Sequence, residues 1–128
     1  GRRSWYNMLR MGSTITAEAW DNVYKSNLDW NHAWGAAAAN VIARRLMGIR
    51  PLKPGFEEIA ICPQPGGLSH ARIVQPSPRG SIGVEWRTRS DGQLNLSVTV
   101  PANSTARLTL PHTGQVVTLP PGHHRISE

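Results

Sequence analysis

The residues of this sequence that are best suited to chemistry lie between Gly12 and Gly35. The stretch combines carboxylates, an imidazole, carboxamides and indoles, which are Glu18, Asp21, Asp29, His32, Asn27, Asn31, Trp20, Trp30 and Trp34. Indole faces stack on the apolar side of a sugar ring, while acids and amides bind its hydroxyl groups. One positioned carboxylate can also act as a general base on water. The stretch therefore favours a carbohydrate site.

The acidic residues of this stretch also have structural interpretations. Glu18 can be a solvated loop acid, or it can pair with Arg10 or Lys25. Asp21 suits a cap on the turn that follows it. Asp29 suits a helix N-terminus, where the helix dipole favours an acid. From the residues alone, the chemical and the structural roles both stay open.

The histidine, the tryptophans and the cysteine also have structural interpretations. His32 can be a packing histidine near the start of a helix. Trp30 and Trp34 lie one helical turn apart and suit a core better than a sugar platform. Trp86 lies in a predicted strand, and we expect it in the core. Cys62 is expected to be a buried or strand-end thiol, because nothing in the sequence around it would activate it.

Several other kinds of site lack their sequence signature. The sequence has no Gly-rich phosphate loop, no Ser-His-Asp order and no His-x-x-x-His pair. Its single cysteine excludes an internal disulfide framework and a multi-cysteine zinc site. No window approaches the ~20 apolar residues of a membrane span. We therefore predict no metal, no cofactor and no membrane span in this sequence.

The charge is basic, with 14 Lys and Arg against 8 Asp and Glu, for a net charge of +6. This excess raises nucleic acid as a partner but does not establish one. The arginines of the second half are scattered about one per predicted strand or turn: Arg72, Arg79, Arg87, Arg89, Arg107 and Arg125. A nucleic-acid surface would cluster them among aromatic residues. We therefore expect no nucleic-acid binding.

Composition divides the 128 residues into two parts. Residues 1–50 hold four of the five tryptophans and no proline, whereas residues 51–128 hold all ten prolines. Fifty residues are too few to bury a core alone. The first part is therefore expected to pack either against the second part or against chain outside this sequence, and we interpret the sequence as a piece of a longer protein. In isolation, its exposed helices are expected to self-associate.

The two parts show different periodicities. In the first part we expect helices over Trp5–Met11 and Leu28–Met47, with Gly12 and Gly48 placed just past their ends. The four alanines at 36–39 would let another helix approach closely, as in a larger helical assembly. In the second part, strands are predicted over residues 57–62, 68–75, 80–88, 93–100, 105–110, 116–119 and 124–127. Many short strands between Pro- and Gly-rich turns predict an antiparallel β-sandwich.

Five short motifs follow one another along the chain. They are STITAEAWD at 13–21, NHAWG at 31–35, GIRP at 48–51, PGF at 54–56 and PQPGG at 63–67, and SPRG follows at 77–80. In this order, from about residue 12 to 88, they resemble the C-terminal part of bacterial α-L-rhamnosidases, which are inverting glycosidases built on an (α/α)6 barrel. The resemblance implies an α+β chain. Residues 1–50 would hold the last barrel helices and an active-site loop, and residues 51–128 the C-terminal β-sandwich.

The same resemblance implies roles for individual residues. Glu18 falls on the family's general base, and His32 on its sugar-contacting histidine. Trp20 is similar to the second tryptophan of the family run, and Asp21 beside it is a further substrate-binding candidate. Ala17 stands where the family often has tryptophan, which bears on the identity of the substrate. The substrate would be a rhamnoside, and the remainder of the catalytic barrel would be a partner.

The implied reaction is a single displacement in which Glu18 activates water while an acid from elsewhere in the barrel protonates the leaving oxygen. This sequence shows no match for the segment that carries that acid, so we expect the chain alone to be inactive. Two other functions stay open: a non-catalytic sandwich that binds carbohydrate or supports a neighbouring domain, and another (α/α)6 enzyme with a different sugar. The periplasm, the cytoplasm and the exterior of a bacterium all stay open as locations.

Overall fold

The computed structural model describes residues 1–30 and 32–128, and these divide into two units, Gly1–Val41 and Ile42–Glu128. The division lies upstream of the boundary predicted after residue 50. Asn31, part of the predicted sugar-binding stretch, lies outside the described residues. Within the described part of the chain, no helix is both long and apolar enough to cross a bilayer.

The first unit begins with the helix α1 (Trp5–Arg10), close to the predicted span. The hydroxyl of Ser4 caps α1 by accepting a hydrogen bond from the backbone N–H of Asn7 at 3.1 Å. Gly12, with φ of +79°, follows the end of the helix, as predicted. The chain then runs through turns and irregular structure until the short helices η1 (Ala33–Ala36) and α2 (Ala37–Val41).

The predicted helix over Leu28–Met47 therefore begins too early. In the structure, residues 28–30 are not helical, because the Asp29 carbonyl accepts from the Glu18 N–H and the Asp29 N–H donates to the Glu18 carboxylate instead. Helical structure runs only from η1 through α2 to η2 (Ile42–Leu46), a π-helical turn that opens the second unit. The core prediction for Trp30 and Trp34 is also wrong for this chain, since they are 55% and 64% exposed.

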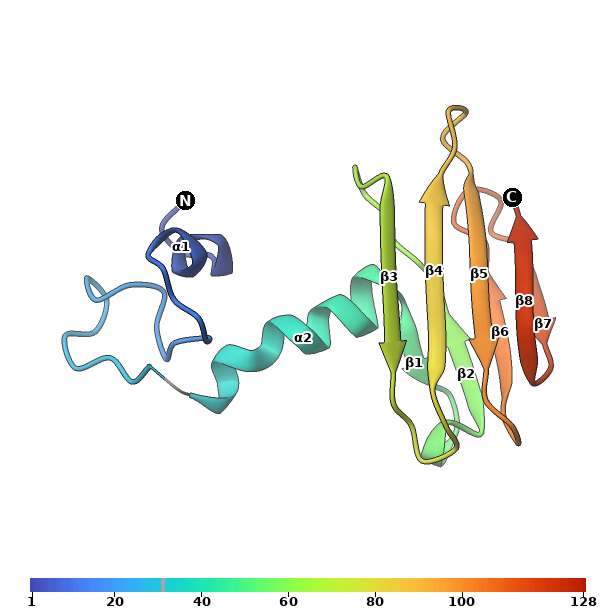
Figure 1. Cartoon of the computed structure of the whole chain (residues 1–128), viewed down its shortest axis with the longest axis horizontal. Coiled ribbons are helices and arrows are strands. Elements are labelled where there is room, and N and C mark those ends of the chain that lie inside the picture. The colour runs from blue at the N-terminus through green and yellow to red at the C-terminus, as the bar shows by residue number, and fades with distance from the viewer. Residues whose placement is uncertain (31) are drawn as a thin grey trace. The chain divides into compact units, whose positions relative to one another are not determined.

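The second unit is a sandwich of two four-stranded sheets, which Figure 1 shows as two layers. Sheet A has the order β1-β2-β6-β7, with bounds Ile49–Pro51, Glu58–Ile61, Thr105–Thr109 and Val116–Leu119. Sheet B has the order β3-β4-β5-β8, with bounds His70–Gln75, Ile82–Thr88, Leu94–Val100 and Gly122–Ser127. The predicted sandwich is thus confirmed, and its seven predicted strands are all present.

Sheet A and the chain next to it differ from the prediction in three ways. The strand β1 was not predicted, because it has only three residues and ends in proline; the short helix η3 (Pro54–Phe56) after it was also missed. The pairing of β2 with β6 is parallel, from Glu58 with Thr105 to Ile61 with Leu108. After β2 the chain crosses to sheet B for three strands before β6 returns beside it, so no hairpin forces the two strands to be antiparallel.

The core of the second unit lies between the two sheets. Side chains along β4 and β5 alternate between buried and more exposed positions, as period-two strands require. The predicted inward set of β5, from Leu94 to Val100, is buried, and Trp86 of β4 is fully buried, as predicted. The helices of this chain are short, so their origin in an (α/α)6 barrel remains a prediction.

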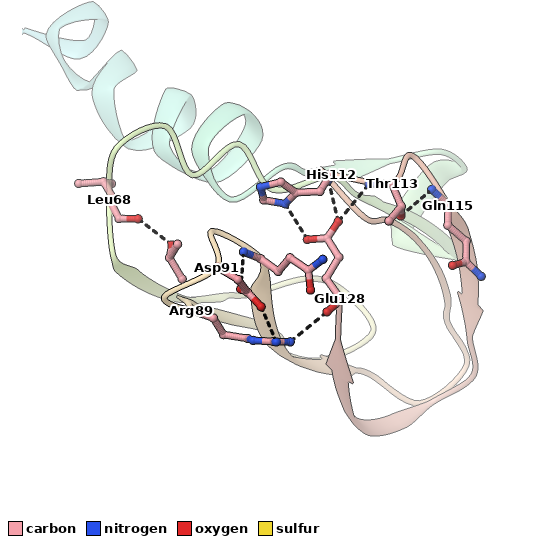
Figure 2. Close-up of polar contacts among 9 residues, drawn as sticks. Leu68, Arg89, Asp91, His112, Thr113, Gln115 and Glu128 are labelled. Carbon is pink, nitrogen blue, oxygen red and sulfur yellow. Dashed lines mark hydrogen bonds and ion pairs between the residues drawn. The ribbon is translucent and has the colours of Figure 1, made fainter.

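A carboxylate at the end of the chain links the two sheets of the sandwich. The side chain of Glu128 is fully buried, and Figure 2 shows it beside the turn between β6 and β7. Its oxygens accept hydrogen bonds from the backbone N–H groups of His112 at 2.6 Å and Thr113 at 3.3 Å, and pair with the His112 ring at 2.9 Å. Its backbone carbonyl accepts from Arg89, which pairs in turn with Asp91 between β4 and β5.

These contacts lower the pKa of Glu128. Burial acts to raise it, but the hydrogen bonds from the His112 ring and from the two backbone N–H groups outweigh that effect. Because the folded pKa lies below the unfolded one, the stabilisation is present above the ordinary glutamate pKa and is lost as pH falls through the folded pKa.

We therefore expect Glu128→Gln to lower the free energy of unfolding near neutral pH by about 1.5–3 kcal/mol, the usual worth of hydrogen bonds to a charged group. The difference from the unsubstituted chain should shrink as the medium becomes acidic. Urea denaturation at several pH values measures both effects. Glu57→Gln, which changes an exposed glutamate of the same unit, is the matched control and should alter stability by no more than about 0.5 kcal/mol. An equal loss in both variants would contradict the special role of Glu128.

Candidate functional site

The backbone of Glu18 is fixed by two segments that follow it in the sequence. Its N–H donates to the carbonyl of Asp29 at 2.9 Å, and its carbonyl accepts a hydrogen bond from the indole Nε1 of Trp34 at 3.1 Å. The predicted site residues Glu18 and His32 are brought together in this way, although 14 positions separate them in the sequence. The irregular chain around Glu18 is therefore positioned by specific hydrogen bonds, without a regular helix or strand.

The carboxylate of Glu18 is nearly enclosed, with its side chain 9% exposed. Oε1 accepts a hydrogen bond from Lys25 Nζ at 2.5 Å, and Oε2 accepts a longer one, 3.3 Å, from the backbone N–H of Asp29. His32 Nδ1 lies 3.9 Å from Oε1. The pairing with Lys25, one of the structural interpretations of Glu18, is therefore present, and it coexists with the position beside His32.

This environment lowers the pKa of Glu18. The hydrogen bond from Lys25 is the largest cause; burial opposes it, while the Asp29 N–H and the charges of Lys25 and His32 add to the lowering. The carboxylate therefore stays ionised at neutral pH. That is the protonation state in which a carboxylate can take a proton from water.

His32 lies between an indole and two acids. Its ring lies on the ring of Trp34, with centroids 3.8 Å apart and an angle of 32° between the planes. Its Nδ1 is 3.7 Å from the carboxylate of Asp29. The prediction that Asp29 interacts with a helix N-terminus is wrong, because the helix begins only at Ala33 and Asp29 faces His32 instead.

A cavity of about 290 Å³ opens beside Glu18, which forms part of its wall. Trp20 lines it, as do Trp34 and Trp5. Trp5 meets Trp20 edge to face at 5.3 Å and donates its indole N–H to the carbonyl of Gly35 at 3.1 Å. The volume is near the lower end of the ~300–1,000 Å³ of ligand pockets, so the cavity is suited to a small ring.

Sequence reasoning missed the roles of Trp5 and Lys25 in this site. Trp5 lies in α1, and only its residue type marked it as a wall for a sugar ring. Lys25 was named only as a structural partner of Glu18, although it is the main cause of the lowered pKa. Lys25 reaches the site from turns of irregular chain, which no periodicity describes.

Asp21 occupies a different position from the other predicted site residues. It does not line the cavity; its Oδ1 accepts from the backbone N–H of Val23 at 3.2 Å, which caps the turn. Its Oδ2 lies 3.4 Å from the amide nitrogen of Asn7. The structure therefore supports the capping interpretation of Asp21, and its contact with a substrate stays a prediction.

Three side chains of the site have the spacing of metal ligands. Ligand atoms of Glu18, Asp29 and His32 lie within 4.8 Å of one another. Two carboxylates and an imidazole can hold a divalent cation. Lys25 already places a positive charge on Glu18 Oε1, however, and would repel such an ion. The ammonium group of Lys25 therefore makes this cluster an unfavourable place for a cation.

Relatives of known description share this sequence over most of its length. An α-L-rhamnosidase of Alteromonas sp. is 32% identical over 96% of this chain, and one of Streptomyces avermitilis is 32% identical over 84%. The chain spans only 13% and 11% of these two proteins. The similarity therefore concerns one part of much longer proteins.

Solved structures of α-L-rhamnosidases match the fold. The enzyme of Aspergillus terreus superposes with a TM-score of 0.89 over 98% of this chain and 16% of its own, at 25% identity. The Streptomyces avermitilis enzyme, solved in complex with L-rhamnose, gives 0.82 over 98% of this chain and 15% of its own, also at 25% identity. The resemblance drawn from the five motifs is therefore confirmed. The family model of the bacterial α-L-rhamnosidase C-terminal domain matches residues 48–125, which is more than half of this chain. The chain therefore belongs to the bacterial α-L-rhamnosidase C-terminal domain family.

Proposed function

We propose that this chain supplies the general-base half of the active site of an inverting glycoside hydrolase that acts on terminal α-L-rhamnosides. The observation that carries the proposal is an ionised, nearly enclosed carboxylate, Glu18, on the wall of an indole-lined cavity. The relatives described as α-L-rhamnosidases supply the substrate class. The missing half, a general acid, would come from a catalytic barrel joined to this chain.

The mechanism is a single displacement. The general acid protonates the glycosidic oxygen, and the bond from that oxygen to the anomeric carbon breaks. Glu18 takes a proton from a water molecule whose oxygen attacks the anomeric carbon from the opposite face, so that the configuration inverts. The two carboxyl groups would lie about 6.5–9.5 Å apart to leave room for that water.

The contacts of Glu18 indicate which oxygen would accept the proton. Oε1 holds the short hydrogen bond from Lys25, whereas Oε2 holds only the 3.3 Å hydrogen bond from the Asp29 N–H. Oε2 is therefore the more available acceptor. His32, which contacts the ring of Trp34, would bind a sugar hydroxyl, and Trp20 would offer its ring to the apolar side of the sugar.

The isolated 128-residue chain should hydrolyse an aryl α-L-rhamnoside no faster than buffer, because it lacks the proton donor. The same chain joined to an upstream barrel should hydrolyse it, and NMR of the first product should show the inverted anomer. Enzyme-like turnover by the isolated chain, or a product of retained configuration from the joined protein, would refute the proposed mechanism.

In the joined enzyme, Lys25→Met should move the acid limb of the pH profile of kcat/KM to higher pH. Lys25 lowers the pKa of Glu18, so its loss raises that pKa toward the ordinary value, and the base becomes protonated earlier as pH falls. Lys53→Met, which removes an exposed lysine of the sandwich, is the control and should leave the limb in place. If the acid limb of Lys25→Met does not move, Lys25 does not control the pKa of the general base.

The partner proposed for the first unit is the rest of the barrel. Trp30 and Trp34 are joined on its surface by other exposed apolar residues: Tyr6, Leu9, Val23 and Tyr24. Monomers rarely expose so much apolar surface without a partner. In isolation the same surface would support self-association of the chain.

A further inference from the structure

The outer face of sheet B presents an ordered grid of side chains. Period-two alternation sends one half of each strand's residues to the core and the other half outward. Across β3, β4, β5 and β8 the outward residues form three rows: His70-Arg87-Asn95-Ser127, Arg72-Glu85-Ser97-Arg125 and Val74-Gly83-Thr99-His123. Only Val74 among these is a large apolar residue. The face, in the layer that Figure 1 shows as β3, β4, β5 and β8, is therefore predominantly polar.

The charges on this face are predominantly positive. Its single carboxylate, Glu85, is shared by a histidine and two arginines: it lies 3.1 Å from the His70 ring, 3.4 Å from Arg87 and 4.0 Å from Arg72. The guanidinium of Arg125, two strands away from Glu85, makes no hydrogen bond or ion pair with the described residues. The grid therefore has guanidinium groups whose charge is not neutralised within the sandwich.

The same face is hollowed where these arginines lie. A groove of about 450 Å³ runs between Arg87 and Arg125, and Asn95, Ser97 and Ser127 contribute polar groups to it. A neighbouring hollow of about 150 Å³ shares Glu85 and Ser97 with it and continues toward β3. No aromatic ring except the His123 imidazole lines either hollow. Because the indole stacking that binds neutral sugars is missing here, affinity would have to come from charge.

We propose that the outer face of sheet B binds an acidic polysaccharide, in which Arg87 and Arg125 hold carboxylate or sulfate groups while Asn95, Ser97 and Ser127 bind sugar hydroxyls. The choice of a glycan over other polyanions rests on the proposed function. A second binding site for the glycan that carries the substrate would keep that glycan bound near the active site of a glycoside hydrolase. The groove spans β4, β5 and β8, about 10 Å of strand spacing, and so accepts an extended chain across the strands.

The test measures the binding of the 128-residue chain to three immobilised glycans at low salt: polygalacturonate, dextran sulfate and uncharged dextran. Binding to at least one of the two anionic glycans, but not to dextran, is expected, and the pair distinguishes carboxylate from sulfate recognition. Arg87→Gln/Arg125→Gln should weaken that binding at least about tenfold, because each guanidinium supplies a charge-assisted contact. Added salt should weaken it further.

The control removes the same two charges from the opposite sheet. Arg50→Gln/Arg107→Gln changes exposed arginines of β1 and β6, which share one row through Ala60 of β2, and should weaken binding less than about twofold. Equal losses in the two double variants, no binding to either anionic glycan, or tighter binding of a DNA oligonucleotide would overturn the proposal. The assay needs no turnover, so its failure is distinct from a failure of the catalytic proposal.

Discussion

Glu18→Gln in the barrel-joined enzyme is expected to lower kcat by roughly 10²–10⁴-fold, the usual contribution of a general base. Glutamine keeps the size of the side chain and its capacity to accept the hydrogen bond from Lys25. It cannot take a proton from water, because an amide oxygen is far less basic than a carboxylate. The loss should therefore fall on kcat with little change in KM, as measured by steady-state hydrolysis of an aryl α-L-rhamnoside.

Glu85→Gln is the matched control for this experiment. Glu85 is also a glutamate with a lowered pKa, and a hydrogen bond from a histidine, His70, is the largest cause in its case. It lies on sheet B and outside the cavity of the first unit. Its substitution should leave kcat unchanged, so a large loss in Glu18→Gln alone would identify the base. Near-normal kcat in Glu18→Gln would remove Glu18 from that role.

The predictions for β5 and for the helix from Leu28 show which features local sequence can predict and which it cannot. Alternation along β5 identified its buried residues, because a strand with one buried face must repeat every two residues. The helix predicted from Leu28 failed at its start, because the Asp29 backbone pairs with Glu18, 11 residues earlier in the sequence. A hydrogen bond between distant segments overrides a local periodicity and leaves no periodic signal of its own.

The arginines of the second half also show that local sequence does not predict which residues come together in the fold. They looked scattered in the sequence, about one per strand or turn, and this argued against a nucleic-acid surface. Strand register nevertheless places Arg72, Arg87 and Arg125 on one face of sheet B. Register depends on pairing between strands, so the sequence of each strand alone could not predict that the three charges gather.

Gly48→Ala is expected to destabilise the sandwich by more than about 4 kcal/mol, beyond the usual range of single substitutions. The sequence predicted Gly48 as the residue just past a helix end, and the structure gives it φ of +75°, as that position requires. A second constraint comes from Cys62, the residue directly after β2. A Cβ at residue 48 would lie 2.0 Å from the carbonyl oxygen of Cys62. That carbonyl cannot move aside cheaply, because the Cys62 N–H is itself bonded to the Gly48 carbonyl at 3.1 Å.

Gly114→Ala separates the two causes. Gly114 has a similar φ of +70°, but a Cβ there would meet no atom within 4 Å. It should therefore cost only about 1–2 kcal/mol, the penalty of a left-handed conformation for a residue with a Cβ. Urea denaturation followed by the fluorescence of the buried Trp86 measures both variants. If Gly48→Ala does not fold at all while Gly114→Ala does, the clash with Cys62 dominates. If the two variants lose equal stability, the backbone conformation alone explains Gly48, and the close approach of Cys62 contributes nothing.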